Sequence, residues 1–231
     1  NDGAGTDYAG HVRIYEYSSS SWSQLGSDID GEAAGDRSGV SVSMNSDGDR
    51  VAIGAYLNDG TGSGAGHVRV YKYRTITEDE FNNNTIAKES GETWNGTKEY
   101  WIRLGSDIDG EAASDLSGHS VSMNSAGDRV AIGAYLNDGT GTDAGHVRIY
   151  EYSSSSWSQL GSDIDGEAAG DRSGVSVSIN SAGDRVAIGA YYNDGTASNA
   201  GHVRVYKYRT ITEDEFNNNT IAKESGETWN G

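Results

Sequence analysis

The chain has 231 residues, with 17 Lys and Arg against 35 Asp and Glu, so its formal net charge is −18 at pH 7. A field of this sign repels phosphate backbones and anionic lipids, which argues against nucleic acid and membrane partners and favours cations. The sequence contains no cysteine, which excludes disulfides and thiolate chemistry. It contains no apolar run long enough to insert in a membrane, and residues 1–10 lack the features of a signal peptide, so we interpret it as a mature or internal segment.

The first third of the chain reads as a series of short strands and turns. Residues 1–9 are a turn rich in Gly, Asp and Asn, and 10–17 (GHVRIYEY) predict a strand. Residues 21–29 predict an outer strand, and an acidic turn follows. Residues 40–44 (VSVSM) alternate with the period of a half-buried strand. An Asp-Gly turn then leads to a partner strand at 50–56, where Ala52, Gly54 and Ala55 are expected to let neighbouring sheets approach closely.

These elements recur, because residues 26–56 return at 105–135 and again at 161–191. Such self-similarity marks a repeat protein. The extra length of one repeat lies at 74–99, and residues 201–231 repeat 66–96 without a change. We call each four-stranded unit a blade. The predicted partition is a partial blade of outer strands at 1–36, a long blade with the 74–99 insert at 37–115, a short blade at 116–171, and a partial long blade lacking its last strand at 172–231.

Each blade holds strands in up-and-down order, without a helical pattern long enough to cross over a parallel sheet. We therefore predict an all-β fold of β-propeller-type blades, each of four antiparallel strands, with short and long repeats alternating. A closed ring usually needs four to eight blades. The sequence is accordingly expected to be a window on a longer array, completed by other copies of the chain or by further repeats of a longer chain.

The order of residues 38–43, an Asp-Gly turn, 51–55 and 66–71 resembles an FG-GAP repeat, the blade of integrin α-subunit propellers, and the resemblance covers essentially the whole chain. Ser-Gly stands in place of Phe-Gly, and Gly-Ala-Tyr in place of Gly-Ala-Pro. The resemblance implies calcium ligands at Ser43, Asn45, Asp47 and Val51. Two of these positions lack a suitable oxygen and Asp47 is alanine in the other copies, so a poor cation site is expected at this turn.

The acidic turns give a separate metal hypothesis, because oxygen ligands at alternating positions suit Ca²⁺. The candidate ligands are Asp28, Asp30, Glu32, Asp36, Asp107, Asp109, Glu111, Asp115, Asp163, Asp165, Glu167 and Asp171. The alternative is that these side chains cap backbone N–H groups of solvated turns.

Histidine and aromatic residues repeat as well. His11, His67, His146 and His202 occupy one equivalent position, which favours a structural role over catalysis, and separate blades would hold them too far apart to share one zinc ion. His119 is unrepeated. Exposed Tyr and Trp side chains could stack on sugars, but packing between blades is preferred for them.

Glycosylation sequons at Asn83, Asn95 and Asn218 favour an extracellular protein, secreted or at the cell surface. The preferred function is a non-enzymatic structural or adhesive repeat protein that forms an extracellular scaffold or assembly. The alternative is an integrin-like propeller that binds a protein or glycan, with Ca²⁺ as a cofactor of that binding. An enzyme is not expected, because the sequence lacks a Gly-x-Ser-x-Gly elbow and its few unrepeated residues do not make a site.

Overall fold

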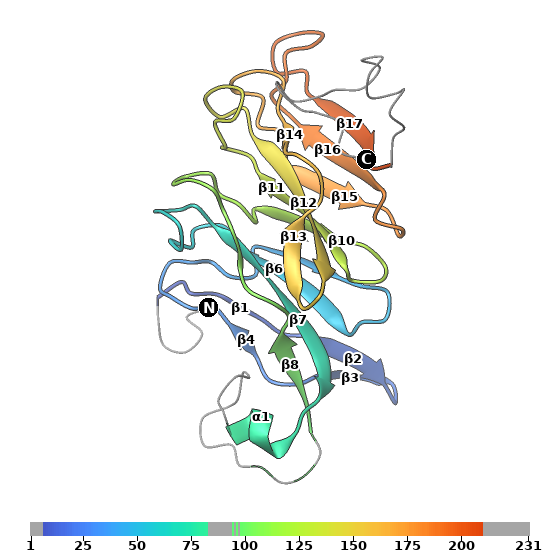
Figure 1. Cartoon of the computed structure of the whole chain (residues 1–231). Helices are drawn as coiled ribbons and strands as arrows, with labels where there is room; N and C mark the ends of the chain where they lie inside the picture. Colours follow the sequence, from blue (N-terminus) through green and yellow to red (C-terminus); the bar gives the residue numbers. More distant parts are fainter. Residues whose placement is uncertain (1–6, 83–93, 95, 97, 210–231) are drawn as a thin grey trace.

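The computed structural model describes residues 7–82, 94, 96 and 98–209. These residues form an all-β protein of several antiparallel sheets in a repeating pattern, which confirms the predicted fold at that level. The described residues do not close into a propeller. The sheets follow one another along the molecule, from the N-terminal strands to β17 (Figure 1).

Two sheets are complete. The long-repeat sheet consists of β5 (Ser41–Met44), β6 (Arg50–Ala55), β7 (His67–Thr75) and β8 (Glu99–Arg103), with the short β9 (Ile108–Asp109) also paired to β7. The short-repeat sheet consists of β10 (Ser120–Met123), β11 (Arg129–Ala134), β12 (His146–Ser153) and β13 (Ser156–Gln159), with β14 (Ile164–Asp165) paired to β12. The third strand of each sheet therefore carries two partners on its outer side.

The remaining strands form partial sheets. The N-terminal strands are β1 (His11–Val12), which pairs with β4 (Ile29–Asp30), and β2 (Tyr15–Ser18), which pairs with β3 (Ser21–Gln24). The C-terminal sheet consists of β15 (Ser176–Ile179), β16 (Arg185–Ala190) and β17 (His202–Lys207). The single strand predicted at 10–17 is interrupted, because β1 and β2 belong to two separate pairings.

The predicted Asp-Gly hairpin turn joins β5 to β6. Gly48 has φ +71°, the left-handed conformation that glycine adopts without strain. The Asn45 side chain closes the turn: its Oδ1 accepts from the Arg50 backbone N–H at 2.9 Å, and its Nδ2 donates to Asp49 Oδ1 at 2.7 Å. Asn45 therefore serves the turn itself in this structure.

The sheets pack face to face through their inner strands. Val68 and Val70 of β7 lie in one core cluster with Met123, Val130 and Ile132 of the next sheet. The same arrangement recurs one repeat further on, where β12 packs against β15 and β16. Each junction is thus a hydrophobic layer between consecutive sheets.

The expected close approach of sheets is confirmed at the glycine of the second strand. A Cβ at Gly54 would lie 2.0 Å from the Gly118 carbonyl oxygen, and one at Gly133 would lie 2.0 Å from the Gly174 carbonyl oxygen. Both carbonyls also accept hydrogen bonds across the junction at 2.7 Å, from the hydroxyls of Ser41 and Ser120. Any larger residue than glycine would push the sheets apart.

The long insert contributes α1 (Glu78–Asn82), a five-residue helix with Phe81 buried. Thr77 and Glu80 form a capping box at its start: the Glu80 N–H donates to Thr77 Oγ1 and the Thr77 N–H donates to Glu80 Oε2. The predicted sequons Asn83, Asn95 and Asn218 lie outside the described residues. Within the described residues, no helix has the length and apolar character needed to span a bilayer.

Candidate functional site

Each junction brings an acidic turn beside a histidine. The pairing register places His11 opposite Asp30, His67 opposite Asp109 and His146 opposite Asp165, so the histidine at the start of each third strand meets the turn that follows the fourth strand. The acidic turn of the preceding repeat reaches the same place. Among the described residues, three groups of potential metal ligands result, each with its ligand atoms within 4.8 Å of one another: His11, Asp28 and Asp30; Glu32, His67 and Asp107; and Glu111, His146 and Asp163.

In the group of Glu111, His146 and Asp163, a buried histidine nitrogen lies near two carboxylate oxygens. His146 Nδ1 lies 3.8 Å from Glu111 Oε2 and 3.6 Å from Asp163 Oδ2. The His146 side chain is 1% exposed, and its Nδ1 is buried without a hydrogen-bond partner. A buried polar atom without a partner is rare in native proteins and calls for an explanation.

Burial sets the charges in this group. Removal from water lowers the pKa of His146 to about 4, and the neighbouring Arg148 acts in the same direction, so the imidazole is neutral near pH 7. Burial also raises the pKa of Glu111, to which Asp163, Asp115 and Asp165 add repulsion. The group therefore combines a neutral imidazole with carboxylates that repel one another.

Arginine occupies the equivalent groups more fully. Asp107 accepts hydrogen bonds from Arg69 at 3.1 and 3.2 Å and from Arg103 at 3.0 Å. Asp28 is held by Arg13 and by Gln24 Nε2 at 2.7 Å. In the third group, Gln159 Nε2 donates to Asp163 Oδ1 at 2.6 Å, and Arg148 contacts Glu111 Oε1 at 3.3 Å.

The last acidic residue of each turn is a buried cap. Asp36 Oδ2 accepts from the Ala33 backbone N–H at 3.1 Å and from Asn58 Nδ2 at 3.0 Å. Asp115 and Asp171 make the same two hydrogen bonds with the equivalent residues. The predicted ligands of one turn therefore have different surroundings. The last residue accepts a hydrogen bond from a backbone N–H, whereas the following residues lie beside histidines or arginines: Asp28, Glu32, Asp107, Glu111, Asp163 and Glu167.

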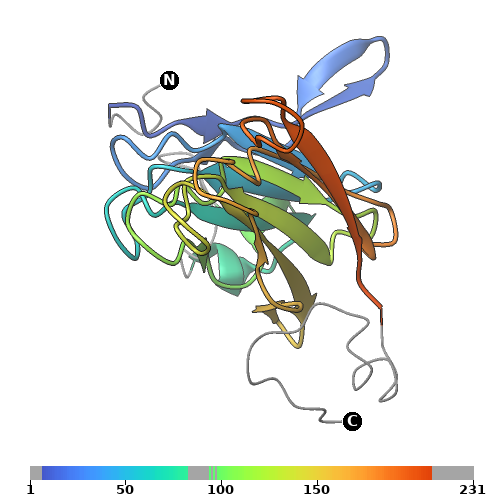
Figure 2. The ribbon, with the colours of Figure 1, turned by 90° about the horizontal axis from the view of Figure 1, so that it is seen from above.

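Tryptophan connects neighbouring sheets on their outer side. Trp101 is 2% exposed and its Nε1–H donates to the Leu25 carbonyl at 2.8 Å, and Trp157 donates to the Leu104 carbonyl at 2.7 Å. The predicted packing between blades is thus confirmed for these two residues. Trp22, at the same position of the first repeat, is 68% exposed on the projecting β2–β3 hairpin (Figure 2).

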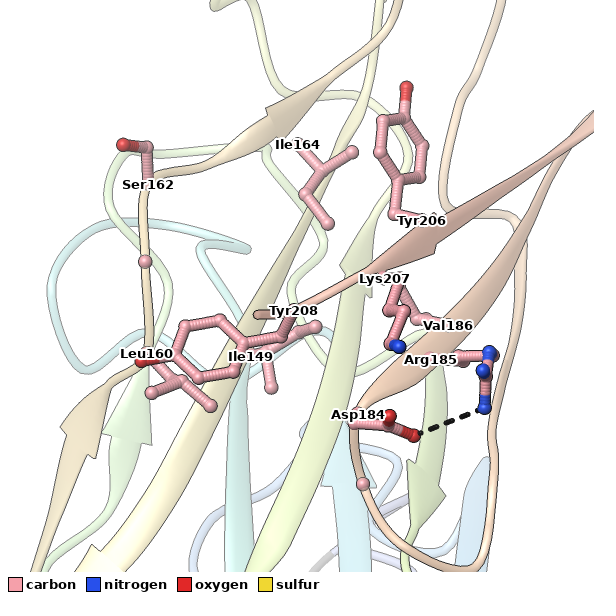
Figure 3. A pocket seen from close by; sticks show the side chains of 12 residues that line it. Ile149, Leu160, Ser162, Ile164, Asp184, Arg185, Val186, Tyr206, Lys207 and Tyr208 are labelled. Carbon is pink, nitrogen blue, oxygen red and sulfur yellow. Dashed lines mark ion pairs between the residues drawn. The ribbon is translucent and has the colours of Figure 1, made fainter. Parts of the chain in front are cut away.

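A cavity of about 300 Å³ lies between the short-repeat sheet and the C-terminal sheet, at the place equivalent to those that Trp101 and Trp157 fill. It is lined by Ile149, Leu160, Ile164, Val186, Tyr206 and Tyr208, among other residues (Figure 3). At the other two junctions this place holds indole: a Cβ at Gly26 or Gly105 would lie 2.9 Å from Trp101 or Trp157, whereas nothing lies within 4 Å of one at Gly161. We call this cavity the indole slot, because the equivalent place at the other two junctions is filled by a tryptophan side chain.

The unrepeated His119 also has a packing environment. Its ring lies edge-on between Tyr56 and Tyr135, with centroid separations of 5.7 and 4.5 Å. Burial lowers the pKa of His119. These contacts account for its position without a chemical role.

Sequence reasoning named the acidic residues but treated the repeated histidines as structural. The neighbourhood arises from strand register and from the stacking of two repeats. The available signal is the constant spacing of 39 residues from the turn to the following histidine, from Asp28 to His67, from Asp107 to His146 and from Asp163 to His202. A scan against known protein families finds no matching model, and a search of curated proteins finds no relative.

Proposed function

We propose that this protein is a non-enzymatic structural or adhesive repeat protein of the extracellular space, in which propeller-type blades resembling FG-GAP repeats build an extended assembly. One observation carries the proposal: the faces left open at the two ends of the stack are those that bind neighbouring sheets inside it.

The open face of the C-terminal sheet is apolar. Val203 and Val205 of β17 are 68% and 67% exposed, whereas the equivalent Val68 of β7 and Val147 of β12 are fully buried by the next sheet. Exposed apolar patches of this kind mark interaction sites. The alternation along β17 fits a face built to receive another sheet.

The opposite end offers the matching element. Val42 and Met44 of β5 are exposed, whereas the equivalent Met123 of β10 and Ile179 of β15 are buried against the preceding sheet. A cavity of about 220 Å³ lies beside them, bordered by Val12 and Ile14. We therefore assign a sheet from a second copy of the chain as the partner of each open face.

The indole slot supports the same assembly. A strand like β8, with Trp at its centre, would pair with the outer edge of β17 and place its indole against Leu160. An unpaired edge beside an apolar slot favours addition of a strand. The repeated contacts supply binding surface, and the described residues offer no asymmetric cluster that suggests an enzyme.

Sedimentation of the purified chain at physiological ionic strength tests the proposal, since salt screens the repulsion expected from the net charge of −18. We expect association that increases with protein concentration and is lost in a Val203→Asp, Val205→Asp variant. A matched control places Asp at Ser154 and Ser155, in the exposed β12–β13 turn, and should associate like the wild type. A chain that stays monomeric at high concentration would count against the assembly.

A further inference from the structure

We propose that Glu111, His146 and Asp163 bind a divalent transition-metal ion of the Zn²⁺ class at the junction between the long-repeat and short-repeat sheets. The ligand atoms are Glu111 Oε2, His146 Nδ1 and Asp163 Oδ2. A water molecule would complete a four-coordinate site. This inference does not depend on the proposed assembly.

The distances fit such an ion. Zinc binds imidazole nitrogen and carboxylate oxygen at about 2.0–2.2 Å, so ligand atoms of a tetrahedral site lie about 3.4 Å apart. The nitrogen of His146 lies 3.6 and 3.8 Å from the two oxygens. Glu111 and Asp163 contact Arg148 and Gln159 through their other carboxylate oxygens, and their side chains are 44% and 29% exposed, so small side-chain movements would complete the coordination.

The unpartnered nitrogen of His146 is the second, independent observation. The Nδ1 atom is buried and aimed between the two carboxylates at distances too long for hydrogen bonds. A bound cation would give this atom a partner and would offset the repulsion between the carboxylates. Without a bound cation, the Nδ1 atom has no hydrogen-bond partner and the repulsion between the carboxylates is not offset.

The donor set selects the class of metal. Imidazole suits zinc and other first-row transition ions, whereas Ca²⁺ takes six to eight oxygen ligands. The group therefore favours Zn²⁺ over the Ca²⁺ expected from the acidic turns alone.

Arginine limits the number of sites. Arg148 binds Glu111 through Oε1 and reaches the Asp109 carbonyl at 2.8 Å, which leaves Oε2 directed at the histidine. In the group around His67, Arg69 instead binds Asp107 through both oxygens and also contacts Glu32. We expect one tightly bound ion per chain.

The ion would join three parts of the chain. Glu111 follows β9, His146 begins β12 and Asp163 precedes β14. Coordination would thus connect the segment between the two sheets, after β9, to the start of β12 and to the turn before β14. By mass action, the bound metal would stabilise the folded state.

Titration of the full, tag-free chain with Co²⁺ and Zn²⁺ tests the site. We expect the visible absorption of four-coordinate Co²⁺ to saturate at one equivalent, and Zn²⁺ to displace it and raise the unfolding temperature. Absence of this spectrum, or equal displacement by Ca²⁺, would overturn the assignment.

Two variants separate metal binding from folding. His146→Gln and Asp163→Asn should each abolish the Co²⁺ spectrum, and the more exposed Asp163 keeps the test valid if the buried histidine variant unfolds. The matched control is His202→Gln, because His202 Nδ1 lies 3.6 Å from Glu167 Oε2 but His202 belongs to none of the three-ligand groups found among the described residues. Loss of the spectrum in the control, or its retention in Asp163→Asn, would contradict the proposed ligands.

Discussion

At the scale of single residues, the glycine in each second strand sets the distance between sheets. Gly133 of β11 and Gly189 of β16 stand in the same local sequence, RVAIGA, and a Cβ at either would meet a serine hydroxyl at 2.4 Å. The two glycines differ in whether a following sheet lies against them. Only at Gly133 would a Cβ collide with a carbonyl of the following sheet, at 2.0 Å from Gly174 O.

This difference makes a matched pair of variants. Gly133→Ala should destabilise the protein by about 1–3 kcal/mol because it overpacks a sheet junction. Gly189→Ala should cost distinctly less, since it shares the strand context without the collision. Urea unfolding of both variants measures the difference, and equal losses would show that the junction at Gly133 is not closely packed.

The sequence predicted that the small residues of the second strand allow close packing of sheets. It did not predict that the repeated histidines lie beside acidic side chains. Ala and Gly in a strand are locally unfavourable, so their repetition signals a packing constraint. The approach of His146 to Glu111 and Asp163 depends on how one repeat stacks on the next. Residue spacing alone does not encode that distance.

At the scale of elements, the fourth strand of each repeat attaches one sheet to the preceding one through tryptophan. Trp101 of β8 is buried against Leu25 and stacks with Tyr73, at a centroid separation of 5.1 Å. Trp22 of β3 keeps the same partner type, Tyr17, at 5.2 Å, yet it has no preceding sheet in the structure. The tyrosine contact is therefore intrinsic to the hairpin, whereas the carbonyl contact belongs to the junction.

We expect Trp101→Phe to lower the free energy of unfolding by about 1–3 kcal/mol, because it removes the hydrogen bond to the partly buried Leu25 carbonyl. Trp22→Phe should change it by less than about 0.5 kcal/mol, as is usual for exposed positions. Chemical denaturation of both variants gives the comparison. A similar effect at the two positions would mean that the indole acts within its own hairpin.

The main strands followed from their patterns, as β5 shows: its alternation of Ser and Val marked a half-buried strand with period two. The short strands β4, β9 and β14 were not predicted as separate elements, and the single strand predicted at 21–29 is divided into β3 and β4. Each of the three short strands has only two residues inside an acidic turn, and each exists because it pairs with the third strand of its own unit. Tertiary pairing, and not local propensity, produces them.

At the scale of the whole molecule, consecutive sheets repeat one set of contacts. The face of β17 and the face of β5 carry the residues that make these contacts inside the stack, but in them the residues are exposed. In such repeat proteins stability is approximately a sum of the units and their nearest-neighbour interfaces. In the assembly that we propose, the apolar face of β17 and the indole slot at Leu160 would be interfaces that await a partner. Adding the next repeat should fill both.

The direct measurement is the urea unfolding of a chain extended after Gly231 by a second copy of residues 97–171, which continues the repeat in phase. We predict a higher urea midpoint for the extended chain and slower hydrogen exchange in β17. Both effects should be lost when the added copies of Val121 and Met123 are changed to Asp. An unchanged midpoint with β17 still exchanging freely would contradict the stacking of sheets through one repeated interface.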